Sequence, residues 1–318
     1  MIKRSFGSTG LMVSALSLGC NNFGRRLDLE KTRTVVDSAI EANINFFDTA
    51  DVHGDRGGSE TFLGALLGNR RKDVTLATKF GLPMDAEGHL AGGSRRYVLS
   101  AVEASLKRLK TEWIDIYYLH RPDPATPVEE TLRALDELVR QGKVRFAGCS
   151  KLPGPQLAYA MEVARTKKLA PLVATQDEYN LLSREIETSL VPVIERLGLA
   201  LVPYFPLASG LLTGKYRRGQ PMPAGTRLSD PHFSARFANE QNFEVVERLV
   251  AFGAERGRTM LELAFGWLLA RPYVASVIAG ATTPEQVRRN ADALGQLTAD
   301  EIAALDRITA RPAASQAR

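Results

Sequence analysis

Residues 45–54 read Asn45-Phe46-Phe47-Asp48-Thr49-Ala50-Asp51-Val52-His53-Gly54, and the interpretation of the rest of the chain starts from this stretch. Its aromatic beginning predicts the end of a buried strand, because aromatic side chains suit a pleated, packed surface. The carboxylate of Asp48 then stands where the strand should end, although a buried charge requires a partner. A polar loop follows and carries His53. Taken alone, the stretch is equally compatible with a strand that runs into an ordinary solvated loop.

Strand and helix patterns alternate on both sides of this stretch. A hairpin with its turn at 7–10 and its second arm at 13–18 is expected first. Eight strands are then predicted to end at or beside Gly19, Asp48, Lys79, His120, Ser150, Gln176, Tyr204 and Gly280. Eight parallel strands joined by helical crossovers predict an α/β fold. This number favours a closed (β/α)8 TIM barrel over an open sheet. Residues 18–24 also lack the glycine motif of an open dinucleotide-binding sheet.

Helical periodicity predicts helices over 29–43, 58–68, 95–109, 127–141, 154–166, 185–197, 243–256, 259–270, 284–294 and 300–308. Residues 209–240 contain Gly, Pro and basic residues and show no clear periodicity. Such a long loop inside a compact domain is often a functional lid, so we expect a long loop after the seventh strand. We expect one barrel domain over 1–310 and a flexible tail over 311–318.

Composition restricts the function. The chain has 318 residues, of which 44% are hydrophobic and 24% charged, and its net charge of +5 is scattered. Scattered charge argues against nucleic-acid binding and is compatible with an anionic small molecule such as a nucleotide. The two cysteines cannot form a disulfide framework, and the four histidines show no metal-ligand spacing. No apolar run reaches the ~18 residues of a membrane span. We expect a cytoplasmic, metal-free monomer or homo-oligomer with a small-molecule partner.

Three charged or titratable residues are expected at the ends of consecutive strands. Asp48, Lys79 and His120 can converge there, because neighbouring strands lie only ~4.8 Å apart. Asp48 and Lys79 can form a charge-assisted pair, and the cation can lower the pKa of a nearby acidic donor. His120 can hydrogen-bond a substrate oxygen. This arrangement suits polarising a carbonyl group. The alternative is a structural ion pair beside a loop histidine.

Nearly the whole chain resembles the aldo-keto reductase superfamily, and its long loop resembles the bacterial, potassium-channel-beta-like branch. The similar stretches are 47–50 with Gly54, 77–80, 115–123, 148–150, Gln176 with 179–180, 204–207 with 210–216, and 278–286 with Asn290. The resemblance implies hydride transfer between a nicotinamide cofactor and an aldehyde or ketone, or the reverse alcohol oxidation. It also implies a catalytic tetrad of Asp, Tyr, Lys and His. Asp48, Lys79 and His120 take three of these places, and His53 stands at the place of the tyrosine.

Three accounts of His53 remain open. It can be a substitute acid, because an imidazolium donates a proton and titrates near neutrality, although nearby Lys79 disfavours its charged form. It can mark a changed substrate or reaction in which His120 does more of the proton work. The chain can also be a weakened or engineered variant. The matching alternative function is an NADP(H)-binding redox-sensing or regulatory barrel with weak turnover. A metal-dependent barrel hydrolase is disfavoured, because its His-x-His ligand set is missing.

The resemblance implies a nicotinamide dinucleotide, with NADP(H) favoured and NAD(H) possible. It implies that the carboxamide is held by Ser150 and Gln176, that the nicotinamide stacks on Tyr204, and that the pyrophosphate is lined by Leu207, Gly210, Leu211 and Lys215. It places Gly280 and Thr282 near the adenosine 2′-position, Gln286 and Asn290 at the adenine, and Arg289 as a source of charge. The further cofactor positions are Gly19, Cys20, Asn21, Asp48, Lys151, Phe205 and Pro206. Three departures from the family pattern are Lys151, where Asn is common, Phe205, where Ser is common, and Thr282, where a basic residue is common.

Overall fold

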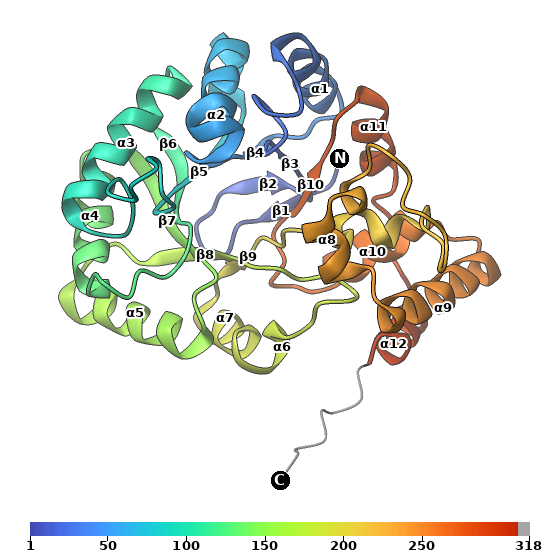
Figure 1. The fold of residues 1–318 in the computed structure, drawn as a ribbon. Helices are drawn as coiled ribbons and strands as arrows, with labels where there is room; N and C mark the ends of the chain where they lie inside the picture. Colours follow the sequence, from blue (N-terminus) through green and yellow to red (C-terminus); the bar gives the residue numbers. More distant parts are fainter. Residues whose placement is uncertain (311–318) are drawn as a thin grey trace.

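Eight parallel strands form a barrel at the centre of the computed structural model, which describes residues 1–310 (Figure 1). The tail predicted for 311–318 lies outside the described residues. The sheet order is β10-β3-β4-β5-β6-β7-β8-β9. The strands are β3 (Leu16–Gly19), β4 (Phe46–Asp48), β5 (Thr75–Phe80), β6 (Ile114–Leu119), β7 (Val144–Ser150), β8 (Leu172–Gln176), β9 (Ala200–Leu201) and β10 (Val277–Gly280). Backbone hydrogen bonds from Leu201 N to Tyr273 O (2.8 Å) and from Ala275 N to Leu201 O (2.9 Å) join β9 to the segment before β10. The predicted (β/α)8 barrel is therefore confirmed.

Helices surround the barrel on its outside (Figure 1). They are α1 (Leu29–Glu41), α2 (His53–Leu67), α3 (Arg95–Leu109), α4 (Val128–Arg140), α5 (Gly154–Lys167), α6 (Ile186–Ser189), α7 (Val191–Leu197), α9 (Glu240–Arg256), α10 (Met260–Leu269), α11 (Pro284–Asp292) and α12 (Ala299–Ile308), with the 3-10 helix η1 (Gly68–Asp73) after α2. The predicted caps Asp28 and Thr283 accept hydrogen bonds from Lys31 N and Gln286 N. The single helix predicted for 185–197 is wrong, because the segment forms two helices. Pro192 lies at the start of α7 and has no N–H to continue the helix before it.

The hydrophobic core has two parts, because side chains alternate between the faces of a strand. One cluster fills the barrel and includes Phe46, Ala77 and Ile116. The other lies between the barrel and its helices and includes Phe47 and Leu76. The two neighbours Phe46 and Phe47 therefore belong to different cores. The same alternation decides which strand-end side chains face the barrel axis.

The predicted hairpin is present and closes one end of the barrel. Its strands are β1 (Lys3–Ser5) and β2 (Met12–Ser14), so the arm predicted over 13–18 is divided between β2 and β3. Phe6 packs inside the barrel, with its ring 5.8 Å from that of Phe46 at 89°. At Gly7 (φ +56°), a Cβ would lie 3.0 Å from Gly198 O and 3.1 Å from Ala200 N. The hairpin thus seals the amino-terminal end of the strands, and the opposite end remains for a site.

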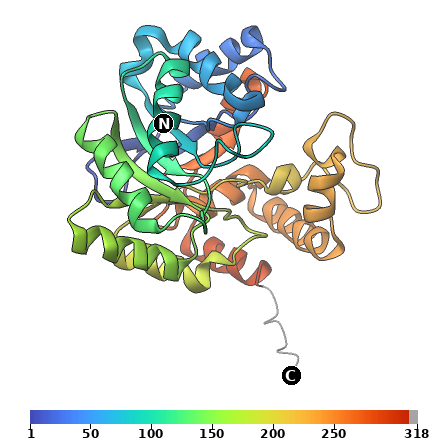
Figure 2. The same cartoon turned by 60° about the vertical axis from the view of Figure 1, so that its left-hand side comes forward.

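A long excursion follows β9, as predicted, but it is not irregular throughout. It contains the 3-10 helices η2 (Ala208–Thr213) and η3 (Arg227–Ser229) and the helix α8 (Pro231–Phe237), which was not predicted. Asp230 caps α8 by accepting from His232 N, and Pro231 occupies its first turn, where no intrahelical N–H is needed. Figure 2 shows this excursion projecting from the side of the barrel. None of the helices in residues 1–310 is both long and apolar enough to cross a membrane.

Candidate active site

Strand alternation places the predicted polar residues on the inner face at the carboxyl-terminal ends of the strands. Asp48 lies two positions after the inward-facing Phe46, and Lys79 lies two positions after Ala77. His120 follows Tyr118 in the same way, although β6 has already ended at Leu119. These positions belong to three neighbouring strands. Their convergence follows directly from the period of two along each strand.

An ion pair occupies the floor of this site. Lys79 Nζ donates to Asp48 Oδ2 at 2.7 Å and to the carbonyl of Thr49 at 2.6 Å. Gln176 Nε2 donates to the other carboxylate oxygen of Asp48 at 2.8 Å, from the other side of the barrel. Asp48 and Lys79 are only 4% and 2% exposed. The pair is therefore buried, and each of its members has a further hydrogen-bond partner, as a buried ion pair requires.

Two histidine rings stand together above this pair. The centroids of His53 and His120 are 6.0 Å apart and the ring planes meet at 87°. The Nδ1 atoms of both rings are buried and have no hydrogen-bond partner in residues 1–310. Burial, followed by the Lys79 charge, lowers the pKa of His53 to about 3, and the same two causes lower the pKa of His120. Both imidazoles are therefore neutral near pH 7, and titration of His53 near neutrality is not what this environment favours.

A cavity of about 690 Å³ opens above these residues and runs toward α11. Of the predicted site residues, all but one line it: Gly19, Cys20, Asn21, Asp48, His53, Lys79, His120, Ser150, Lys151, Gln176, Tyr204, Phe205, Pro206, Leu207, Gly210, Lys215, Gly280, Thr282, Gln286, Arg289 and Asn290. Leu211 is the exception, because its side chain is fully buried in the core between barrel and helices. A place for Leu211 beside the cofactor would therefore rest on its backbone rather than on its side chain.

The middle of the cavity has groups suited to an anion. The hydroxyl of Ser209 is buried and has no partner in residues 1–310, although the residue lines the cavity. Gly210 has φ +96°, and the Lys215 ammonium would lie 3.6 Å from a Cβ placed there. A free hydroxyl, a glycine backbone and a cation at one point fit the pyrophosphate of a dinucleotide. Ser209 was not predicted, because one Ser in a loop gives no sequence pattern.

The end of the cavity beside the ion pair suits an amide. Ser150 Oγ donates to the carbonyl of Gln176 at 2.7 Å, which fixes the hydroxyl so that its lone pairs remain available. Tyr204 lines the same part of the cavity and packs edge-on against Phe205, with ring centroids 5.3 Å apart. An orientated hydroxyl beside an aromatic face fits a flat ring that carries a carboxamide.

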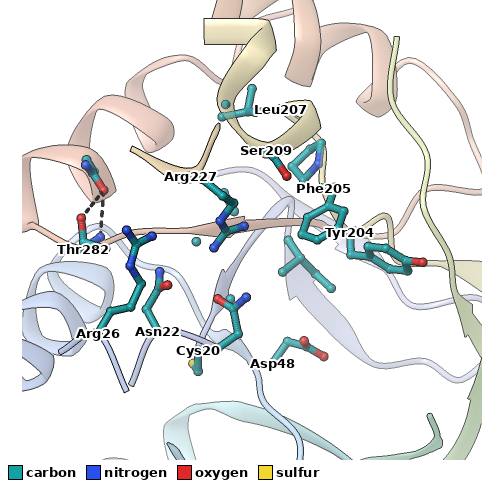
Figure 3. Close-up of a pocket in the computed structure, with 18 of the residues that line it drawn as sticks. Cys20, Asn22, Arg26, Asp48, Tyr204, Phe205, Leu207, Ser209, Arg227 and Thr282 are labelled. Atoms are coloured by element: carbon teal, nitrogen blue, oxygen red, sulfur yellow. Dashed lines mark hydrogen bonds between the residues drawn. The ribbon is translucent and has the colours of Figure 1, made fainter. Parts of the chain in front are cut away.

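The other end of the cavity is lined by cations that were not predicted. In Figure 3, Thr282 and Arg26 lie at one end of the pocket, Tyr204 and Phe205 lie at the other, and Arg227 points into the space between them. Arg26 Nη2 donates to the carbonyl of Gly225 at 3.2 Å and so links the loop after β3 to the excursion after β9. Burial, then the Arg26 charge, lowers the pKa of Arg227. The only sequence signal for these residues is the basic character of the excursion.

Gln286 already has an internal partner, because its Oε1 accepts from Thr282 N at 2.8 Å and from Thr282 Oγ1 at 3.1 Å. Asn290 is 5% exposed and lines the cavity one helical turn further along α11. Thr282, Gln286 and Asn290 therefore line the same end of the cavity. Gln286 contributes its side-chain amide nitrogen there, because its oxygen is occupied.

A second cluster of buried polar groups lies behind the site and was not predicted. Asp51 is 1% exposed, and neither carboxylate oxygen forms a hydrogen bond of ordinary geometry within residues 1–310. Burial, then the charge of Glu60, raises the pKa of Asp51 to about 7. Glu60 itself accepts from Arg108 at 2.7 Å and from Thr78 at 2.5 Å. No group of three or more metal-ligand side chains that could hold an ion occurs in residues 1–310.

The closed parallel barrel, with its polar residues gathered where the strands end, defines a (β/α)8 barrel protein with a cavity at the carboxyl-terminal ends of its strands. A sequence model of the Aldo/keto reductase family matches residues 15–310. The chain therefore belongs to the aldo/keto reductase family.

Two curated relatives extend this result. The "Probable voltage-gated potassium channel subunit beta" of Oryza sativa subsp. japonica is 36% identical over 300 residues, which cover 92% of this chain and 90% of the relative. The "L-glyceraldehyde 3-phosphate reductase" of Escherichia coli (strain K12) is also 36% identical, over 317 residues, 95% of this chain and 91% of the relative. The chain is thus similar over nearly its whole length to a named reductase and to a named channel subunit. The predicted likeness to the potassium-channel-beta branch is confirmed.

Proposed function

We propose that the protein is an NADP(H)-dependent oxidoreductase that reduces an aldehyde or ketone, or oxidises the corresponding alcohol. The observation that carries this proposal is the buried Lys79–Asp48 pair beneath His53 and His120, at one end of a cavity long enough for a dinucleotide. The nicotinamide cofactor would supply the hydride when it is bound. The family match and the named reductase among the relatives support an oxidoreductase.

The residues of the chain have separate roles in this proposal. His120 and His53 are neutral, so each can donate one N–H hydrogen bond to a carbonyl oxygen and stabilise the charge that develops there. Lys79 sets a positive field beneath that oxygen, and Asp48 with Gln176 holds Lys79 in place. His53 thus acts as a neutral hydrogen-bond donor in the position of the family's tyrosine. This N–H would hold the developing alkoxide by a hydrogen bond, and the proton that the product finally takes up would come from solvent.

The cavity supports a phosphorylated cofactor. Ser209, Gly210 and Lys215 suit the pyrophosphate, and Ser150 and Tyr204 suit the nicotinamide end. Arg26, Arg227 and Arg289 line the cavity and can compensate an additional 2′-phosphate, although Thr282 is uncharged. We therefore favour NADP(H) over NAD(H). The two cysteines, Cys20 and Cys149, are buried and unpaired, which fits a reducing compartment such as the cytoplasm.

A single-turnover experiment tests the function. The protein is loaded with one equivalent of NADPH and mixed with an excess of a reactive aldehyde, and loss of NADPH absorbance is followed by stopped flow. We expect complete oxidation of the bound NADPH in one fast phase. Tight NADPH binding without oxidation by any reactive aldehyde or ketone would contradict a reductase.

That second outcome would support the other candidate, a cofactor-binding regulatory barrel. The observation that favours it is His53, because an imidazole kept neutral is a weaker proton donor than an imidazolium. The similarity to a protein named as a potassium channel subunit points the same way. In this case, the affinity of the protein for a partner should differ between the NADPH and NADP⁺ complexes.

A further inference from the structure

The cavity has a basic group beside His120, Lys151, which the resemblance gives only as one of the cofactor positions and which stands where the family commonly has Asn. Lys151 directly follows β7, lines the cavity, and places its Nζ 5.6 Å from the centroid of the Tyr204 ring. Arg121 directly follows His120 at the end of β6, the strand next to β7. Leu119 of β6 and Cys149 of β7 are register partners. Arg121 lies two positions after Leu119, and Lys151 lies two positions after Cys149. Lys151 thus lines the cavity at its histidine end, and the exposed Arg121 lies near enough outside this lining for its charge to act on Lys151.

Neither cation forms an ion pair within residues 1–310, although the charge of Asp177 acts on Lys151 and partly offsets the repulsion from the other cations. Among residues 1–310, no carboxylate lies within ion-pair distance of Lys151 or Arg121. The nearby carboxylates are already engaged: Asp48 with Lys79, Glu178 with Arg236, and Asp177 with Thr175 and the backbone N–H of Lys151. Asp123, near Arg121, accepts from Gly93 N, Ala125 N and Thr126. A further anion would therefore find free cations here rather than existing pairs.

The surroundings of Lys151 also disfavour its charge while no anion is present. Partial burial within the cavity walls and then repulsion from Lys79 lower the pKa of Lys151, and Arg121 and Arg236 add to this repulsion. Its backbone is left-handed, with φ +59°, a conformation that side chains other than Gly, Asn and Asp rarely adopt. Such strain is retained mainly at functional sites. An anion bound here would offset the repulsion between Lys151 and the neighbouring cations, which would explain why a lysine occupies position 151.

We propose that Lys151, assisted by Arg121, binds a phosphate or carboxylate group carried by the carbonyl substrate. This inference rests on the proposed function and adds the substrate class, which is an anionic aldehyde or ketone. The charged group would lie at the mouth of the cavity beside Tyr204, and its carbonyl would reach the two histidines. Arg236 contributes less, because it is already paired with Glu178.

Matched substrate pairs test the proposal. Initial rates with NADPH are compared for glycolaldehyde phosphate and glycolaldehyde, and for 4-carboxybenzaldehyde and 4-methylbenzaldehyde. We expect kcat/KM to favour the anionic member of at least one pair by ~10-fold or more, the scale of one charge-assisted hydrogen bond. The two pairs distinguish a phosphate from a carboxylate. Effects on cofactor binding cancel in each ratio, because both members of a pair meet the same cofactor complex.

Three variants test which residue causes the preference for the anionic substrate. Lys151→Asn removes the cation but tolerates the left-handed backbone, and it should lower the anionic-to-neutral ratio ~10-fold, a ratio from which any change in cofactor binding cancels. Arg121→Gln should lower the ratio by a smaller factor. Lys167→Met, on the outer helix α5, is the control and should leave the ratio unchanged. An unchanged ratio in Lys151→Asn would overturn the proposal.

The outcomes separate this inference from the function on which it rests. Equal reduction of anionic and neutral aldehydes overturns the anion site and leaves the reductase intact. If no aldehyde is reduced, the reductase fails, and calorimetric titration of the NADP⁺ complex with ethyl phosphate decides the anion site instead. Binding that weakens ~10-fold in Lys151→Asn supports the site, and equal or absent binding in both proteins overturns it.

Discussion

His53 and His120 meet edge to face, with ring centroids 6.0 Å apart and planes at 87°, and neither Nδ1 has a partner in residues 1–310. The pair lies over Lys79, whose charge opposes protonation of both rings. Because the folded-state pKa of His53 is about 3, far below its ordinary value of 6.5, its protonated form appears only in acid. The site therefore contains two neutral N–H donors at the pH of the cell.

The pH profile should reflect this. Under single-turnover conditions with NADPH, we expect no inflection from His53 between about pH 5 and pH 8, where an ordinary histidine titrates. An effect of His53 on the rate should appear only in stronger acid, where the imidazole becomes protonated. The control is His53→Phe, which removes the titratable ring and should show the same flat profile at a lower rate. A wild-type inflection near pH 6.5 that disappears in His53→Phe would contradict the neutral imidazole.

Replacing His53 by Tyr should preserve or raise the reduction of simple aldehydes. A phenol hydroxyl near Lys79 can donate a proton whose pKa the cation lowers. Stopped-flow rates and NADPH affinity are measured for His53→Tyr and His53→Phe, and the Phe variant should lose ~100-fold in rate. Loss of activity in His53→Tyr with unchanged NADPH affinity would show that the site has become specific for an imidazole.

The Lys79–Asp48 pair should affect chemistry and stability separately. Lys79→Met should slow hydride transfer ~100-fold or more and leave the Asp48 charge buried without its partner. Breaking a buried pair on one side typically destabilises by about 3–5 kcal/mol. The double variant Asp48→Asn, Lys79→Met should recover much of this stability in urea unfolding but none of the rate. Near wild-type turnover in Lys79→Met would remove Lys79 from the proposed site.

Asp51 should make the free energy of unfolding depend on pH. Its folded-state pKa is about 7, raised from 3.8, so the folded protein holds a proton that the unfolded chain releases. The proton on Asp51 contributes its full stabilisation of the folded state below about pH 4. This stabilisation decreases as the pH rises toward 7 and is absent above that pH. A shift of about three units corresponds to about 4 kcal/mol. Urea unfolding from pH 4 to 8 should show this fall in the wild type and a smaller one in Asp51→Asn. Equal slopes would contradict the raised pKa.

Arg26 and Arg227 should control how the cofactor is held. Arg26→Ala breaks the link to Gly225 across the cavity, so NADPH should dissociate ~10-fold faster or more, as expected for one lost hydrogen bond to a charged group. Arg227→Ala should weaken NADPH more than NADH if it meets the 2′-phosphate. Dissociation rates are measured by displacement of fluorescent NADPH. Equal losses for NADPH and NADH would assign Arg227 to a part that the two cofactors share.

The barrel and the ion pair could be predicted from sequence because they depend on local patterns. Strand alternation and the spacing of helices determine which residues end each strand, and the period of two directs Asp48, Lys79 and His120 inward. The cofactor residues were accessible through resemblance. All of these except Leu211 line the cavity. Leu211 follows Gly210 in η2, where positive φ values change the direction of successive side chains in a way that no periodic pattern records.

The remaining features depend on tertiary context. The pKa of His53 is lowered by burial, which needs the packed α2 and the loops around it. Arg26 and Arg227 are distant in sequence and meet over the cavity only because the excursion folds back. The short helix α8 lacks a hydrophobic period long enough to recognise, although the Asp230-Pro231 start is a local signal for a helix.

The amino-terminal hairpin covers one end of the barrel, and the cavity opens at the other end. Phe6 joins the side chains that fill the barrel interior, so no passage runs through the barrel to its amino-terminal end. Under the proposed function, cofactor and substrate then share one passage, and the molecule that enters first lies deeper. A spent substrate must depart before the dinucleotide can be exchanged. The amino-terminal hairpin, which contacts neither substrate nor cofactor, would thereby help to set the order in which they bind and leave.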